Sequence, residues 1–91
     1  MDFEWDEAKS ERNRIERGLP YDIAEGLFNG KLIERTADRR DYGEVRVKVI
    51  GQVGTSILVC VYTDRDGVRR IISLRDANRR ERNAYRASQG G

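Results

Sequence analysis

Any chemistry in this chain must use a carboxylate, tyrosine, lysine or arginine, because the sequence contains no histidine. The absence of histidine removes the commonest general base and the commonest metal ligand. Residues 65–86 hold eight arginines against three acidic residues, whereas residues 1–30 hold four Lys and Arg against eight acidic residues. This uneven charge predicts an anionic partner: a nucleic acid, an acidic protein or an anionic membrane.

Length and composition favour one small folded domain. The chain has 91 residues, a net charge of only +2, and equal shares, 37% each, of apolar and charged residues. We expect a single domain over 1–86 and a flexible tail over 87–91. Cys60 is the only cysteine and lies in an apolar run, so it predicts a core side chain and excludes an internal disulfide.

Two classes of protein are disfavoured by what the sequence lacks. No apolar run approaches the roughly 20 residues that span a bilayer, and no secretory segment is recognisable. We therefore expect a cytoplasmic protein without a membrane partner. Phosphate-binding loops, zinc-ligand spacings and dinucleotide fingerprints are also missing, so no metal and no cofactor is expected.

The N-terminal third predicts a short strand and two helices. Residues 2–5 alternate as an edge strand would, burying Phe3 and Trp5. Asp6 is a suitable N-cap for a helix that ends at Gly18. Its expected buried stripe, together with the preceding strand, is Trp5, Ala8, Ile15 and Leu19. A second helix follows Pro20, with a stripe formed by Ile23, Ala24, Leu27 and Phe28.

The remainder predicts strands joined by short turns, and then a last helix. Strands are expected at 32–36, 44–50, 57–63 and 68–75, with a loop at 37–43 and turns at 51–56 and 64–67. Asp76 is the expected N-cap of the C-terminal helix. The fold class is therefore α+β: an antiparallel sheet of three to four main strands, two N-terminal helices on one face, and a C-terminal helix.

The turn lengths suggest a register that gathers basic residues. If Ile50 pairs with Ile57, and Thr63 with Val68, then Arg46, Val61 and Arg70 form one row across three strands. Arg46 and Arg70 would then lie on the order of 10 Å apart, with Lys48 beside them. Two such guanidiniums suit successive phosphates of one strand. The alternative is that Arg46 and Lys48 simply form the wet face of a half-exposed sheet.

In the last helix, Glu81 and Tyr85 lie one turn apart and share a face. A glutamate among arginines should have a lowered pKa, so Glu81 either pairs with Arg75 or acts as a general base. The alternative is a plain surface ion pair. Tyr85 is either a reactive hydroxyl or an aromatic that docks the helix. Lys9 is either a ligand for an anion or an ordinary solvated lysine.

Four stretches in this order together resemble the BrnT family of ribonuclease toxins from bacterial type II toxin–antitoxin systems: FEWDEAKSERNRIERG at 3–18, RVKVIG at 46–51, LVCVYTDR at 58–65 and RIISLRDANRRERNAY at 70–85. The resemblance implies a RelE-like fold. It also implies RNA cleavage without a metal, through attack by the ribose 2′-hydroxyl. The sequence departs from the usual family pattern at Glu16-Arg17-Gly18, where Lys-His-Gly is common, and at Leu74, where alanine is usual.

The resemblance also implies site residues and partners. Trp5 and Lys9 match the family pattern among the N-terminal positions. The expected catalytic residues are Arg46, Arg70, Arg75, Glu81 and Tyr85. The expected RNA-binding residues are Lys9, Lys48, Arg65, Arg79 and Arg82.

The implied partner is a BrnA-like antitoxin with a ribbon-helix-helix region, which forms a hetero-oligomer with the toxin and alone contacts operator DNA. Two alternatives remain open at this point. The chain could be a module that binds nucleic acid or an acidic partner without cutting, or its cationic surface could serve mainly as the antitoxin interface.

Overall fold

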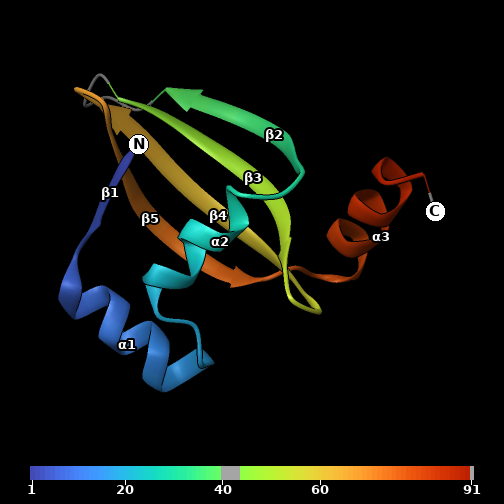
Figure 1. The fold of residues 1–91 in the computed structure, drawn as a ribbon, viewed down its shortest axis with the longest axis horizontal. Coiled ribbons are helices and arrows are strands. Elements are labelled where there is room, and N and C mark those ends of the chain that lie inside the picture. Colours follow the sequence, from blue (N-terminus) through green and yellow to red (C-terminus); the bar gives the residue numbers. More distant parts are fainter. Residues whose placement is uncertain (40–43, 91) are drawn as a thin grey trace.

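The fold is built on one five-stranded sheet (Figure 1). The computed structural model describes residues 1–39 and 44–90, except for the side chains of residues 36–39. The strands lie in the order β1-β5-β4-β3-β2. Their bounds are β1 Asp2–Trp5, β2 Leu32–Arg39, β3 Val45–Val53, β4 Ser56–Arg65 and β5 Val68–Asp76.

The sheet is mixed, which corrects the predicted antiparallel sheet of three to four strands. Strands β2 to β5 are antiparallel neighbours, but β1 pairs with β5 in parallel, from Asp2↔Val68 to Trp5↔Ile71. The predicted edge strand is therefore confirmed, and its direction was missed. Strand β1 has only four residues, and so short a segment contains no pattern that predicts pairing with a strand more than sixty residues away in the sequence.

Both turns within the meander are tighter than predicted. Val53 pairs with Ser56, and Arg65 pairs with Val68, so each turn has only two central residues. Gly54 has φ 60°, and Asp66 and Gly67 have φ 54° and 79°. Positive φ at both central residues is the requirement of a type I′ hairpin, which Asp-Gly satisfies well. The adjoining strands are correspondingly longer.

This tighter pairing changes the register but not the faces. Ile50 pairs with Val59 rather than with Ile57, and Thr63 pairs with Arg70 rather than with Val68. The predicted pairings were wrong by two residues. Because side chains alternate with a period of two, such a shift leaves the residues of β3, of β4 and of β5 up to Ile71 on their predicted faces. An irregularity between Ile71 and Ser73 moves the last residues of β5 to the face opposite the predicted one. The predicted loop at 37–43 overlaps β2 up to Arg39, and its remainder lies outside the described residues.

Helix α1 (Glu7–Arg17) begins and ends as predicted, but its inward face is polar. Asp6 accepts a hydrogen bond from the Lys9 amide, and Gly18 closes the helix with φ 72°. The Ser10 hydroxyl accepts from the Tyr21 amide at 2.8 Å. The Asn13 amide donates to the carbonyls of Leu19 and Leu74, at 2.7 and 2.9 Å.

The apolar stripe predicted for α1 was therefore wrong in part. Ile15 is 69% exposed, and Ala8 also faces solvent. Leu19, just beyond the helix, is buried, and Trp5 packs against the core. The hydrogen bonds that Ser10 accepts and Asn13 donates anchor the helix, and an apolar stripe does not.

The other helices are short. The predicted second helix is a 3-10 turn, η1 (Tyr21–Ile23), followed by α2 (Ala24–Leu27). Helix α3 (Arg79–Ser88) is capped by Asn78, so Asp76 as N-cap was wrong. Asp76 instead ends β5, because that strand runs on to pair with Leu58. Helix α3 also extends two residues into the segment predicted to be a tail.

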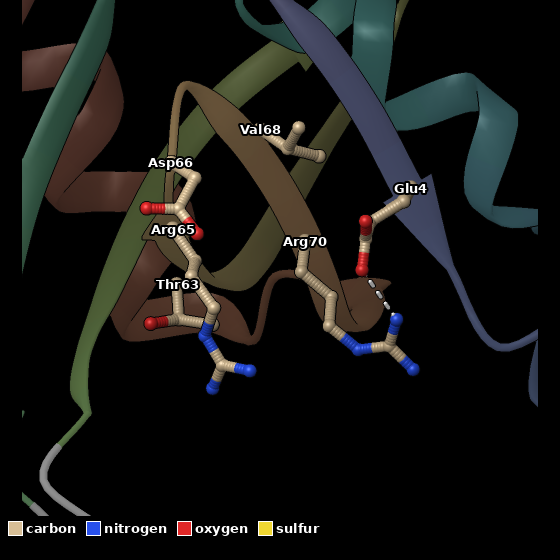
Figure 2. Close-up of a pocket in the computed structure, with 6 residues that line it drawn as sticks. All are labelled: Glu4, Thr63, Arg65, Asp66, Val68 and Arg70. Carbon is tan, nitrogen blue, oxygen red and sulfur yellow. Dashed lines mark hydrogen bonds and ion pairs between the residues drawn. The ribbon is translucent and has the colours of Figure 1, made fainter.

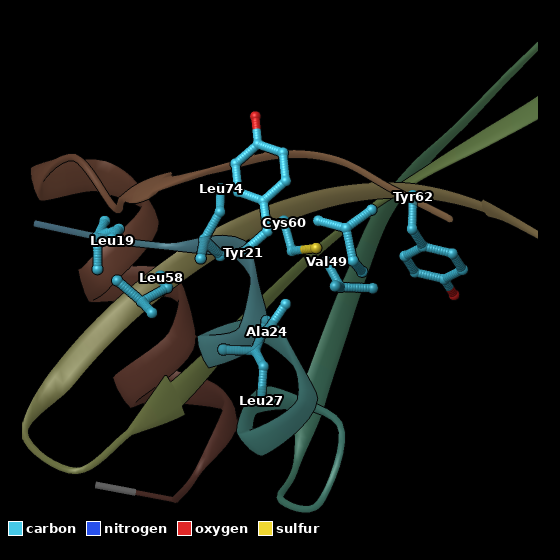
Figure 3. Close-up of a cluster of buried hydrophobic side chains, with 10 residues drawn as sticks. Leu19, Tyr21, Ala24, Leu27, Val49, Leu58, Cys60, Tyr62 and Leu74 are labelled. Carbon is cyan, nitrogen blue, oxygen red and sulfur yellow. The ribbon is translucent and has the colours of Figure 1, made fainter. Parts of the chain in front are cut away.

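The hydrophobic core lies on both sides of the sheet. The larger cluster, drawn in Figure 3, buries the sheet face covered by η1 and α2; it contains Leu19, Tyr21, Ala24, Leu27, Val49, Leu58, Cys60, Tyr62, Ile71 and Leu74. Cys60 is fully buried there, as predicted, and burial raises the pKa of its thiol to about 12. On the other face, Ala77 and Tyr85 pack against Ile50, Ile57 and Val59. We call this second face the α3 face.

Candidate functional site: a cationic sheet face

A β-bulge brings Arg70 and Arg75 of β5 onto one face of the sheet. Val61 pairs with Ser73, whereas its neighbour Tyr62 pairs with Ile71, so Ile72 is an extra residue. In a regular strand, Arg70 and Arg75 would point to opposite faces because they are five positions apart, an odd number. With the bulge, Arg70 lies opposite Thr63 and Arg75 lies opposite Val59. Both therefore lie on the α3 face.

The same face collects basic residues from β3. Ile50 is part of the α3-face core, and Lys48 and Arg46 precede it by two and four residues. Lys48 pairs with Val61, and the next step along the ladder sets Arg46 opposite Thr63. The predicted row of Arg46 and Arg70 across three strands is therefore present. Its middle member is Thr63 rather than Val61, because of the two-residue change in register.

One carboxylate organises the end of this face nearest α3. Glu81 receives two hydrogen bonds from Arg75, at 2.8 and 2.9 Å, and lies 3.1 Å from the Lys48 ammonium. It also accepts from the Asn78 amide at 2.9 Å, while Asn78 accepts from the Glu81 amide at 2.8 Å. The two hydrogen bonds between Asn78 and Glu81 form a capping box. The contacts of Glu81 with Lys48 and Arg75 join this first turn of α3 to β3 and β5.

These contacts fix the charge of Glu81. Hydrogen bonds from Arg75, then from the Asn78 backbone and from Lys48, lower the pKa of Glu81 to about 2, although burial opposes the shift. The same pairing raises the pKa of Arg75. Glu81 is therefore an anion at neutral pH and a weak proton acceptor. We call Glu81, Arg75 and Lys48 the Glu81 cluster.

A cleft of about 530 Å³ opens beside the Glu81 cluster. Its lining residues come from β2, β3 and the start of α3: Arg35, Lys48, Asn78, Arg80 and Glu81. Arg35 is the extra residue of a second bulge, in β2. Cations beside the positive end of a helix dipole suit an anionic ligand such as a phosphate.

A second hollow lies at the other end of the face, beside the β4–β5 hairpin (Figure 2). Its volume is about 290 Å³, and its lining residues are Glu4, Thr63, Arg65, Asp66, Val68 and Arg70. Figure 2 shows the Arg65 and Arg70 side chains extending to the same side of the sheet, with Glu4 beside Arg70. The Arg70–Glu4 ion pair is 2.6 Å long. We call this hollow the Arg70 cavity.

Glu44 joins the remaining two arginines of this end. One of its oxygens accepts from Arg46 at 3.3 Å and the other from Arg65 at 2.8 Å. Across the α3 face, ion pairs thus connect five cations (Arg46, Lys48, Arg65, Arg70 and Arg75) to three carboxylates (Glu4, Glu44 and Glu81). Cations remain in excess, so the face can attract an anion while its arginines stay oriented.

The two ends of the face are too far apart to hold one phosphate. Arg75 and Arg70 lie opposite Val59 and Thr63, which are four residues apart on β4. At about 3.3 Å per residue, their backbones are about 13 Å apart. The arrangement therefore suits a chain of phosphates better than a single group.

The structure does not bring every predicted site residue to the exposed cationic surface of this face. Tyr85 is buried against the sheet, and its hydroxyl donates to the Lys31 carbonyl at 3.0 Å. Arg82 donates to the Ala77 carbonyl at 2.6 Å, where it closes the turn before α3. Arg79 is exposed at the start of α3. Lys9 is exposed on α1, which is anchored by Ser10 and Asn13 beside the opposite core cluster.

The sequence analysis missed several residues of the site, among them Glu4, Arg35, Glu44, Thr63 and Arg80. Thr63 could have been found from the type I′ signal of Asp66-Gly67, which sets the register. Glu4 could not, since its place depends on the long-range pairing of β1 with β5.

Comparison with known proteins comes from one family model. The model for the ribonuclease toxin BrnT, of type II toxin–antitoxin systems, matches residues 5–81. This range includes the five cations of the α3 face. No curated protein sequence matches the chain at a significant level. None of the helices in residues 1–39 and 44–90 is long and apolar enough to cross a membrane.

Proposed function

The chain belongs to the BrnT family of ribonuclease toxins of type II toxin–antitoxin systems, and from this premise we propose that its α3 face cleaves RNA without a metal ion. The observation that carries the proposal is the set of five cations on one sheet face, to which the bulge at Ile72 adds Arg75. Membership in the family implies a ribonuclease and a protein antitoxin. The metal-independent mechanism and the residues that perform it are our proposal.

In the transition state of this reaction, the scissile phosphate of the RNA carries more negative charge than in the ground state. Attack by a ribose 2′-oxygen on the adjacent phosphorus places extra charge on the non-bridging oxygens. Preoriented guanidiniums stabilise that charge more in the transition state than in the ground state. We assign the scissile phosphate to the Arg70 cavity, which Arg65 and Arg70 line. Arg46 lies on the neighbouring strand β3 and shares Glu44 with Arg65.

The Glu81 cluster then holds a neighbouring phosphate of the same RNA strand. The backbones of Arg75 and Arg70 are about 13 Å apart, a distance that suits contacts with two phosphates of one strand. Glu81 is in this proposal a positioning residue, because it orients Arg75 and Lys48 and is too weak a base to take a proton readily. Tyr85 positions α3 through its packing and its bond to Lys31. Arg79 and Arg80 extend the basic surface around the first turn of α3.

The reaction type is tested by incubating the purified protein with a defined RNA in excess EDTA. We expect cleavage that gives a 2′,3′-cyclic phosphate and a 5′-hydroxyl. Intact RNA that is nevertheless bound in a salt-sensitive way would contradict catalysis by the free protein and leave a binding module. Cleavage that stops in EDTA and returns with added divalent ions would contradict metal independence.

The proposal also includes a BrnA-like antitoxin with a ribbon-helix-helix region, which joins the toxin in a hetero-oligomer and carries the contact with operator DNA. An acidic antitoxin segment would complement the five cations of the α3 face and block RNA at the same time. Purified antitoxin should displace a labelled, uncleavable 2′-deoxy oligonucleotide from the toxin. Simultaneous binding of both would place the antitoxin on another surface.

A further inference from the structure

The three carboxylates of the α3 face differ in how many of their oxygens are bound by protein side chains. Both oxygens of Glu81 bind Arg75, with further contacts to Lys48 and Asn78. Each oxygen of Glu44 receives one arginine, and its side chain is only 16% exposed. Within the described residues, Glu4 uses one oxygen, Oε2, to pair with Arg70, and its side chain is 49% exposed. Glu4 therefore keeps an oxygen available to a ligand.

Glu4 also stands where a proton acceptor would be needed. It lines the Arg70 cavity together with Arg65 and Arg70, and Figure 2 shows it beside Arg70 at the rim of that space. The parallel pairing Glu4↔Arg70 fixes this position, because paired residues in neighbouring strands share a face. A phosphate bound by the two guanidiniums would have its adjacent ribose within reach of the free carboxylate oxygen. Such proximity is the first requirement of a general base.

We propose that Glu4 is the general base of the cleavage reaction, an inference that rests on the proposed ribonuclease function. The Glu4 carboxylate takes the proton of the ribose 2′-hydroxyl. The 2′-oxygen then forms a bond to phosphorus with its freed electron pair, and the bond from phosphorus to the 5′-oxygen breaks. The leaving 5′-oxygen takes a proton from water. Arg70 binds both the phosphate and Glu4, so the Glu4 carboxylate stays close to the ribose 2′-hydroxyl.

The decisive variant is Glu4→Gln. Glutamine has nearly the same shape and keeps an oxygen that accepts from Arg70, but it cannot take a proton at neutral pH. The fold should persist, since a half-exposed ion pair contributes at most about 1 kcal/mol. Asp2→Asn is the matched control: it removes one carboxylate from the same strand, outside the cavity lining.

The experiment measures single-turnover cleavage of a defined RNA, and the affinity for its 2′-deoxy analogue, for both variants and the wild type. We expect E4Q to cleave roughly 100-fold more slowly or worse, with RNA affinity within about threefold of wild type, and D2N to match the wild type. A wild type that cuts no RNA would instead count against the proposed function itself. Cleavage by E4Q at close to the wild-type rate, beside an active wild type, would overturn only the role of Glu4.

Chemical rescue separates a base from a structural ion pair. Glu4→Ala leaves space in which added formate can stand in for the lost carboxylate. We expect formate to raise the cleavage rate of E4A at least tenfold and to leave D2N unchanged. An E4A variant that formate does not accelerate, or a loss of rate that follows a loss of RNA affinity, would overturn the proposal.

Discussion

Among single residues, Glu81 has the widest structural influence. Its carboxylate connects a lysine of β3, an arginine of β5 and the backbone amide of Asn78, the N-cap of α3. A buried carboxylate with three charged or polar partners is stable only as an anion. The charge of Glu81 and the position of α3 therefore depend on the same contacts. A substitution of Glu81 should lower the stability of the fold as its first effect.

Glu81→Gln should lower the free energy of unfolding at pH 7 by roughly 2 to 3 kcal/mol. Glutamine removes the charge that offsets Arg75 and Lys48. The pKa of Glu81 is lower in the folded than in the unfolded chain, so its stabilisation is present above about pH 4.3 and is lost as the pH falls towards about 2.

Urea unfolding at pH 7 and at pH 3 measures the free energy of unfolding of the wild type and of E81Q. Glu16→Gln, which changes an exposed glutamate of α1, is the control. The gap between wild type and E81Q should shrink at pH 3. An equal gap at both pH values would contradict the assignment of the lowered pKa to Glu81.

At the scale of elements, the two bulges decide which residues meet. In β3, Val47 and Val49 lie on the face of the larger core cluster and Ile50 lies on the α3 face, as regular alternation requires, and Cys60 lies in the core as its apolar run predicted. Alternation alone would separate Arg70 from Arg75, because nothing in the run of residues 70–75 marks Ile72 as an insertion. The family resemblance, rather than periodicity, predicted that these arginines act together.

The sequence was a good guide to the two caps of α1 and a poor guide to long-range pairing. Asp6 and Gly18 cap α1 as predicted, since their chemistry is local. The place of β1 beside β5, and with it the role of Glu4, depends on contacts between the two ends of the chain. The polar inner face of α1 was missed for a similar reason: Asn13 finds its partner in β5.

Gly51 tests the packing between β3 and the helices. A Cβ at this position would lie 2.6 Å from the Leu32 side chain and 2.9 Å from that of Leu27. Gly51→Ala should therefore destabilise the fold by about 1 to 3 kcal/mol.

Gly30→Ala is the control for this substitution, because a Cβ there meets nothing within 4 Å. It should change stability by less than about 0.5 kcal/mol. Thermal melting of both variants makes the comparison, and equal melting temperatures would contradict the close approach at Gly51.

At the scale of the whole molecule, charge is divided between the faces of the sheet. The α3 face carries five cations in ion pairs with three carboxylates. On the opposite face, Arg69 is covered by the rings of Phe28 and Tyr62, at 4.7 and 4.1 Å, and pairs with Asp64 at 2.8 and 2.9 Å. Arg69 therefore stabilises the fold, whereas the arginines of the α3 face remain open to a ligand.

RNA binding should follow this division of charge. For single-stranded RNA, each neutralised phosphate contributes a slope of about −0.7 to a plot of log affinity against log salt. Arg70→Ala should reduce the slope by about that amount. Arg12→Ala, which removes an exposed arginine of α1, should leave it unchanged. Equal slopes for both variants would indicate that RNA binds elsewhere.

The measurement that tests the central claim most directly is cleavage of a defined RNA in EDTA by Arg70→Ala, Arg75→Ala and Arg12→Ala beside the wild type. We expect the wild type and R12A to cut at equal rates, and R70A and R75A to be slower by about 100-fold or more. Cleavage by R70A and R75A at the wild-type rate would contradict the assignment of the ribonuclease site to the α3 face.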